Sequence, residues 1–142
     1  MKRDKLGDFG LLLLRIFLAG ILVYYGSQKM FGLFGGEGIQ GTISAFEKQG
    51  FPQWLTMLAI VAESAGSIAV VLGLLTRLAA FGIACTMATA SYEMFMMHTN
   101  YKDAHLPLAL CGMALALIFT GAGTFSLDYV MTGGRRKKRK AD

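Results

Sequence analysis

The sequence predicts an all-α membrane protein, namely an antiparallel bundle of four transmembrane helices with a short interfacial helix in the first outer loop. Its 142 residues are 54% hydrophobic and 16% charged, and most of the charge lies at the two ends, which leaves a middle too apolar for an ordinary soluble domain. Four apolar runs of about 18 to 22 residues each match the roughly 20 that a helix needs to cross about 30 Å of hydrocarbon. The expected solvent is therefore the bilayer.

The four spans use up most of the chain. We expect them at residues 9–31, 54–75, 77–99 and 105–123. One transmembrane domain would then cover residues 9–131, between an amino-terminal tail at 1–8 and a basic tail at 132–142. A cleaved secretory signal is the rival interpretation of the first run, but this run continues through Tyr24, Tyr25 and Gly26 with no small-x-small cleavage site. It is predicted to be an uncleaved first span.

The distribution of Lys and Arg predicts the orientation of the helices. With the amino terminus inside, the inner side receives Lys2, Arg3, Lys5, Arg77 and the tail Arg135, Arg136, Lys137, Lys138, Arg139 and Lys140. The outer side then holds only Lys29, Lys48 and Lys102. Because cations concentrate on the cytoplasmic side, we expect a multi-pass protein of a prokaryotic inner membrane with both termini cytoplasmic. The basic tail is interpreted as a topology anchor, and no nucleic-acid partner is expected.

The stretch "GEGIQG" at Gly36 to Gly41 matches the dinucleotide-binding pattern G-x-G-x-x-G, with Glu63 some way downstream. A true fingerprint must follow a buried strand and open a helix in a soluble βαβ unit. Here the glycines follow a predicted span, and Glu63 lies within the second apolar run. No nucleotide is therefore expected at this loop.

The rest of the first outer loop shows helical amphipathicity. Between Thr42 and Gln49, Ile43 and Phe46 share one face while Glu47 and Lys48 take another. This pattern predicts a short helix that lies in the membrane interface.

Three ionisable residues, Arg15, Glu63 and Glu93, interrupt otherwise apolar spans. A charge at the bilayer centre costs several kcal/mol unless it is paired or protonated, so all three should face the bundle interior. We expect Glu63 to bond Lys29 or Gln28 on the first span, or to share a proton with Glu93. Internal charges that only fix helix register are the structural alternative.

The predicted orientation brings a set of polar side chains to the outer half of the membrane. This candidate site for a quinone or for protons consists of Tyr25, Gln28, Lys29, Glu63, Glu93, His98, Asp103 and His105. His98, Asp103 and His105 also form a weak candidate metal site, against the more ordinary alternative of interfacial hydrogen bonding. Cys85 and Cys111 lie at different depths and are not expected to form a disulfide.

Several segments resemble the DoxX family of small four-helix membrane proteins of bacteria and archaea. They are "LLLLRIFLAGILVYYGSQKMFGLFGG", "AESAG", "GLLTR" and "GAGTFSLD". Carried over by position, the family's motif residues are Arg15, Gly26, Gln28, Lys29, Glu63, Gly66, Arg77, Ser126 and Asp128, with Asp103 and His105 before the last span. The chain departs from the family at Tyr25, where many members carry His, and at Asp103, where Glu is usual.

The resemblance implies a role without fixing a reaction. The family is named from a subunit associated with an archaeal terminal oxidase and thiosulfate:quinone oxidoreductase, and other members are linked to quinones, thiols or oxidative stress. We therefore expect an accessory or assembly subunit of a redox-linked membrane complex. The alternative is a quinone-interacting oxidoreductase subunit. The chain has no flavin, haem or iron–sulfur motif, so no cofactor other than a quinone is expected, and a partner would supply the electrons.

Overall fold

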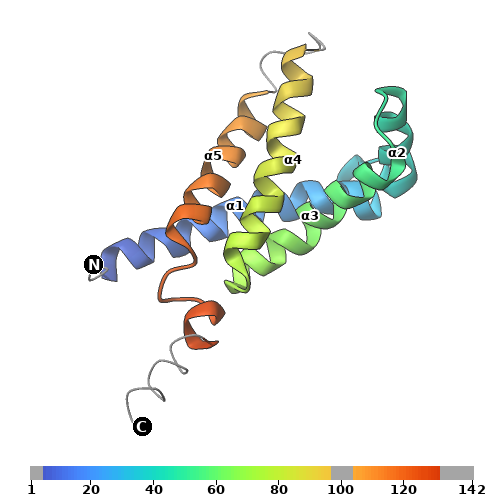
Figure 1. Ribbon diagram of the computed structural model, residues 1–142. Helices are drawn as coiled ribbons and strands as arrows, with labels where there is room; N and C mark the ends of the chain where they lie inside the picture. The colour runs from blue at the N-terminus through green and yellow to red at the C-terminus, as the bar shows by residue number, and fades with distance from the viewer. Residues whose placement is uncertain (1–4, 97–103, 132–142) are drawn as a thin grey trace.

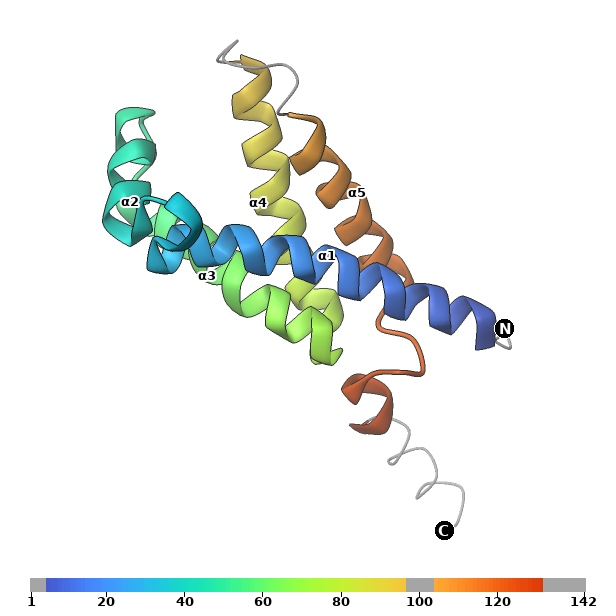
Figure 2. The same ribbon diagram turned by 180° about the vertical axis from the view of Figure 1, so that it is seen from behind.

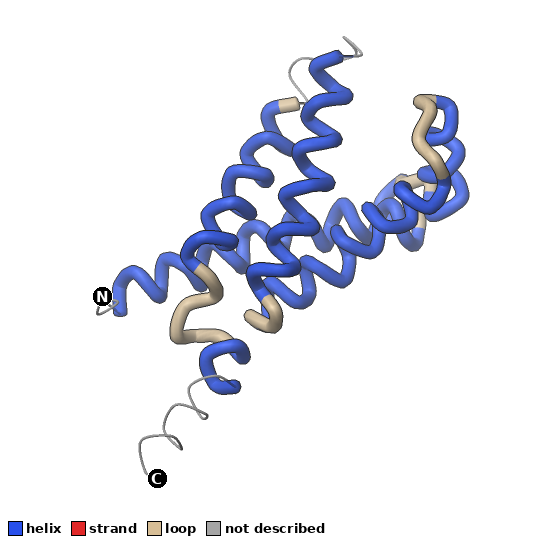
Figure 3. The backbone as a smooth tube through the Cα atoms, viewed as in Figure 1, coloured by secondary structure: helices blue, strands red, loops and turns tan. Residues whose placement is uncertain are grey.

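A computed structural model describes residues 5–96 and 104–131 of the chain (Figure 1). All regular secondary structure in these two ranges is helical. The elements are α1 (Lys5–Phe31), the short 3-10 helix η1 (Leu33–Gly35), α2 (Gly38–Lys48), α3 (Gln53–Leu72), α4 (Thr76–Met96) and α5 (His105–Thr120). Residues 127–131 add one more helical turn. Within the described ranges, loops join the end of one helix to the start of the next, as Figure 3 shows.

The long helices pack as two antiparallel pairs. One pair is α1 with α3 and the other is α4 with α5, and the α3–α4 and α1–α5 contacts join them. Figures 1 and 2 show that the pairs cross and diverge towards their far ends. The predicted single antiparallel bundle of four helices is not confirmed, because the two pairs cross instead of sharing one common axis.

Three of the described helices, α1, α3 and α4, are long and apolar enough to cross a membrane. The fourth apolar helix, α5, has 16 residues, a rise of about 24 Å. The expected fourth span to residue 123 is too long, because Gly121 (φ 74°) ends the helix. The first helix begins at Lys5 rather than at residue 9, so residues 5–8 extend it beyond the apolar run and place Asp8 in its first turn.

Glycines in the left-handed conformation end two of the long helices. Gly32 (φ 65°) follows α1, and Gly73 (φ 68°) follows α3. After Gly73, the Leu74 N–H donates to Ala69 O at 2.9 Å, which satisfies a carbonyl of the last turn. The next residue, Leu75, also has a positive φ of 47°, so this short turn holds a conformation that branched side chains rarely adopt.

The core forms where the two pairs cross, and small residues bring the helices close together. Ala19 of α1, Ala80 and Ala84 of α4 and Ala114 of α5 are all buried. They pack with larger buried side chains, namely Leu18, Leu22, Val70, Ile83, Met87, Leu110 and Leu117. Small residues at contacts are typical of helices that associate in lipid, where close van der Waals packing replaces the hydrophobic effect.

Large apolar side chains cover the outside of the molecule. Phe17 is 64% exposed, Trp54 68% and Phe119 80%, and each belongs to a different long helix. A water-soluble domain rarely exposes contiguous apolar surface on this scale, and lipid contact accounts for it.

The loop between α1 and α3 contains the helix that the sequence predicts there. It covers Gly38–Lys48 rather than residues 42–49, and it buries Thr42 and Ile43 against the rest of the chain. Its location at the membrane surface stays a prediction.

Candidate functional site

An ion pair joins the first two long helices. Lys29, in the last turn of α1, donates to both carboxylate oxygens of Glu63 in α3, at 2.8 Å and 2.7 Å. The Glu63 side chain is 3% exposed and that of Lys29 is 29% exposed. Glu63 is thus directed inward, and its expected bond to Lys29 is present.

This ion pair lies on the wall of a cavity of about 450 Å³. Tyr25 of α1 lines the same wall, and the rest of the lining is mainly apolar: Leu22, Met87, Ala90, Met94, Leu106, Pro107 and Leu110. The cavity therefore lies between the two helix pairs, since α1 and α3 supply its polar side and α4 and α5 its apolar side. An apolar pocket with a few convergent polar groups is the usual form of a small-molecule site.

Only part of the predicted outer site lines this cavity. Gln28 and Glu93 are half-buried and lie outside its lining. Glu93 Oε1 is buried and has no hydrogen-bond partner among the residues that the structure describes. His105 is exposed at the start of α5, one residue before the lining residue Leu106.

The weak candidate metal site falls largely outside the described residues, because His98 and Asp103 lie in the segment 97–103. Within residues 5–96 and 104–131, no group of three or more His, Cys, Asp and Glu side chains is placed to hold a metal ion. Cys85 and Cys111 are both free thiols.

The glycine-rich loop has the wrong neighbours for a dinucleotide site. Gly36 follows the 3-10 helix after α1, and Gly38 to Gly41 form the first turn of α2. The motif thus follows a helix, whereas a nucleotide fingerprint follows a strand.

Of the predicted topology anchors, Arg77 is exposed in the first turn of α4, and Arg135 to Lys140 lie outside the described residues.

Arg15 is 1% exposed, in keeping with its predicted inward direction, and it is bound entirely by backbone carbonyls. Nε donates to Val70 O at 2.8 Å, and Nη2 donates to Val71 O at 2.6 Å. Nη1 donates to Ala122 O at 2.9 Å and to Phe125 O at 2.8 Å. One guanidinium therefore satisfies carbonyls in the last turn of α3 and fixes the segment after α5.

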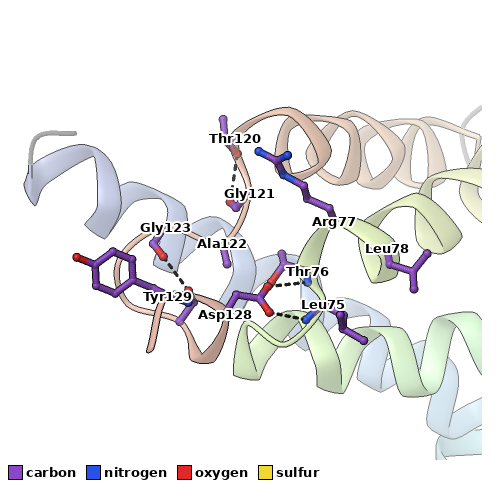
Figure 4. Close-up of a pocket in the computed structure, with 11 residues that line it drawn as sticks. Leu75, Thr76, Arg77, Leu78, Thr120, Gly121, Ala122, Gly123, Asp128 and Tyr129 are labelled. Carbon is purple, nitrogen blue, oxygen red and sulfur yellow. Dashed lines mark hydrogen bonds between the residues drawn. The ribbon is translucent and has the colours of Figure 1, made fainter. Parts of the chain in front are cut away.

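Two carboxylates have roles that the sequence does not predict. Asp128 accepts from the Leu75 and Thr76 N–H groups at 2.8 Å and 3.0 Å, so it caps the start of α4 (Figure 4). Asp8 is buried, and its Oδ2 accepts from the Thr124 hydroxyl at 2.6 Å. The "SLD" motif marked Asp128 as notable, but no local pattern indicated a partner about fifty residues earlier.

The fold and site define a small helical membrane protein with an inward-facing ion pair beside an apolar cavity. The sequence model of the DoxX family matches residues 10–99, and the chain belongs to that family. No solved structure matches the chain.

The chain matches three curated relatives over nearly the whole length of each. The Escherichia coli K12 protein named "Inner membrane protein YqjF" is 31% identical, over 89% of this chain and 95% of its own. The Bacillus subtilis 168 protein named "Putative oxidoreductase CatD" is 26% identical, over 94% and 95%. A Haemophilus influenzae relative is 30% identical, over 88% and 92%.

Proposed function

We propose that this protein is an accessory subunit of a redox-linked complex in a prokaryotic inner membrane, and that its cavity receives the headgroup of a membrane quinone. All four apolar helices span the bilayer in this proposal, with both termini cytoplasmic and the cavity towards the outer side. The observation that carries it is the Lys29–Glu63 pair on the wall of an otherwise apolar cavity between the helix pairs. The names of the Escherichia coli and Bacillus subtilis relatives agree with the location and with oxidoreductase chemistry.

The residues of the cavity fit a quinone headgroup in size and chemistry. The volume of about 450 Å³ is within the usual range for small-ligand pockets, roughly 300 to 1,000 Å³. Lys29 has three N–H donors, of which two go to Glu63, so the third can bond a quinone oxygen. Met87, Met94 and Leu110 provide an apolar surface for the ring.

Each polar residue has a distinct task in this proposal. A bound quinone supplies a two-electron, two-proton acceptor. Lys29 orients its oxygen and offsets negative charge there, while the Glu63 carboxylate holds or releases a proton beside it. The Tyr25 hydroxyl, on the same wall, offers a second donor. The electrons come from a partner subunit, because the chain has no redox centre motif of its own.

The experiment measures quinone that co-purifies with the protein. We expect the full chain, extracted gently from native membrane, to carry quinone. Ala90→Phe fills the cavity and should lower the quinone-to-protein ratio at least about fivefold, the equivalent of about 1 kcal/mol. Ala88→Phe is the matched control, because Ala88 is exposed on the same helix and does not line the cavity. Equal loss in both variants, or none in either, would contradict the proposal.

A second candidate is an assembly subunit that binds no quinone. Lys29 and Glu63 already satisfy each other, as a purely structural pair would. Complementation of a deletion strain separates the two candidates. Under the quinone proposal, Glu63→Gln folds but fails to complement; under the assembly alternative it complements, and the purified complex contains no quinone.

A further inference from the structure

A second pocket, of about 690 Å³, lies at the opposite end of α4 and α5 from the ion-pair cavity. It forms where the turn between α3 and α4 meets the segment after α5, and Figure 4 shows its lining. The two pockets share no residue. The pocket at this end of α4 and α5 is therefore separate from the ion-pair cavity.

Arg77 brings an uncompensated cation to this pocket. It is exposed, and it forms no hydrogen bond or ion pair with any residue in the described ranges. The Arg77 side chain passes Gly121, where an added Cβ would lie 3.5 Å from Nε, an ordinary van der Waals distance. The carboxylate that shares the pocket, Asp128, already accepts from the Leu75 and Thr76 N–H groups. The guanidinium is thus available to an anion from outside the chain.

The surroundings of Arg77 match the boundary between headgroups and acyl chains. The turn joins two helices that are each long and apolar enough to cross a membrane, so it lies at the depth of a bilayer surface. Leu75 and Leu78 flank the cation and are 63% and 68% exposed. An arginine between exposed leucines can bond a phosphate while the leucines contact the chains below it.

A hydroxyl on the wall adds a second donor. Thr76 is 1% exposed, and its Oγ1 is buried with no hydrogen-bond partner in the described part of the chain. A buried hydroxyl without a partner costs about 1 to 3 kcal/mol, so it indicates a missing acceptor. Thr76 and Arg77 are adjacent in the first turn of α4, and both line the pocket.

We propose that this pocket binds the phosphate group of an anionic phospholipid. Arg77 donates to the phosphate oxygens, the Thr76 hydroxyl supplies a further donor, and Leu75 and Leu78 pack on the acyl chains. The six cations from Arg135 to Lys140 follow shortly after this segment in the sequence and add a general attraction for the same anionic surface. This lipid site is independent of the quinone cavity and stands whether or not a quinone binds there.

The test is a titration of the full chain in mild nonionic detergent with phosphatidylglycerol, followed by native mass spectrometry. Arg77→Gln should weaken phosphatidylglycerol binding about fivefold, the effect of one cation close to an anionic surface. Arg77→Lys should keep most of the affinity because it keeps the charge, and Thr76→Val should lose about threefold with the hydroxyl. Lys5→Gln is the matched control: it also removes one cation, and it lies outside the pocket.

Specific outcomes would overturn the proposal. Equal binding of phosphatidylcholine, or an equal loss in Lys5→Gln and Arg77→Gln, would show that the pocket selects no anionic lipid. Competition by inorganic phosphate at the same concentration as phosphatidylglycerol would assign the site to a soluble phosphate instead. If Arg77→Gln proves unstable, Thr76→Val and the comparison of the two lipids on the unaltered chain decide the question.

Discussion

Gly73 provides the space that the guanidinium of Arg15 occupies. A Cβ at position 73 would lie 2.6 Å from Arg15 Nη2 and 2.5 Å from the Ser126 Cβ, both closer than real contacts allow. Gly73 also has a φ of 68°, which disfavours any side chain. A single glycine thus ends α3 and makes room for the residue that bonds its last carbonyls.

Gly73→Ala should therefore destabilise the protein more than its backbone angle alone requires. Gly35→Ala is the matched control, since Gly35 has a φ of 83° and a Cβ there would meet nothing within 4 Å. The control should lose about 1 to 2 kcal/mol, and Gly73→Ala at least twice that loss. Thermal unfolding in detergent measures the difference, and equal losses would mean that Arg15 moves aside freely.

The Lys29–Glu63 pair should show strong coupling in a double-mutant cycle. Lys29→Met leaves the buried Glu63 carboxylate without its partner and should cost about 2 kcal/mol, below the 3 to 5 of fully buried pairs because Lys29 is partly exposed. Lys29→Met combined with Glu63→Leu should recover most of that loss. Unfolding midpoints of the two single variants and the double variant give the coupling free energy, and additive losses would contradict a close pair.

Arg15 should not tolerate lysine. The guanidinium donates from three nitrogens to four carbonyls, whereas an ammonium donates from one atom and cannot span them. Val70 O also accepts from the Gly73 N–H, so Arg15→Lys should leave at least one of the Val71, Ala122 and Phe125 carbonyls without a donor, at about 1 to 3 kcal/mol each. The fraction of monodisperse protein after detergent extraction checks this. Arg77→Lys serves as the control and should extract normally, since Arg77 is exposed.

Asp128→Asn should loosen the start of α4 without unfolding the protein. An amide side chain has one acceptor oxygen, so only one of the Leu75 and Thr76 N–H groups keeps its bond. The expected loss is about 1 kcal/mol, as for other helix caps. Amide hydrogen exchange should rise at positions 75 and 76 and stay unchanged at the start of α3. Unchanged exchange at both ends would mean that the carboxylate cap contributes nothing.

The sequence predicts the long helices well because the signals that determine a helix are local in the chain. Runs of apolar residues and the cost of charge in lipid both act within a few turns. The second span, expected to reach residue 75, is too long, because Gly73 (φ 68°) ends α3 after Leu72. The cost of charge in lipid accounts for the inward direction of Arg15 and Glu63. Lys29 is also predictable as the partner of Glu63, because the two are opposite charges on adjacent spans.

Relationships between distant segments are what the sequence does not reveal. The apolar runs that predict α4 and α5 do not reveal how the two helix pairs cross, and this crossing decides that Met87 and Leu110 line the cavity while Glu93 does not. Asp8 and Thr124 lie 116 positions apart, and no periodicity connects them. The bonds from Arg15 to the Ala122 and Phe125 carbonyls are equally unpredictable, because every residue has a backbone carbonyl and the sequence does not mark which one accepts.

The carbonyl acceptors of Arg15 have a consequence for biosynthesis. Arg15 leaves the ribosome early, yet two of its four acceptors, the carbonyls of Ala122 and Phe125, are made more than a hundred residues later. Until then at most two of its four acceptor carbonyls, those of Val70 and Val71, exist, so we expect the nascent first helix to carry an incompletely bonded cation, which is costly in lipid. We therefore expect a product truncated at Thr120, which lacks the Ala122 and Phe125 carbonyls, to be degraded in the membrane faster than the full chain.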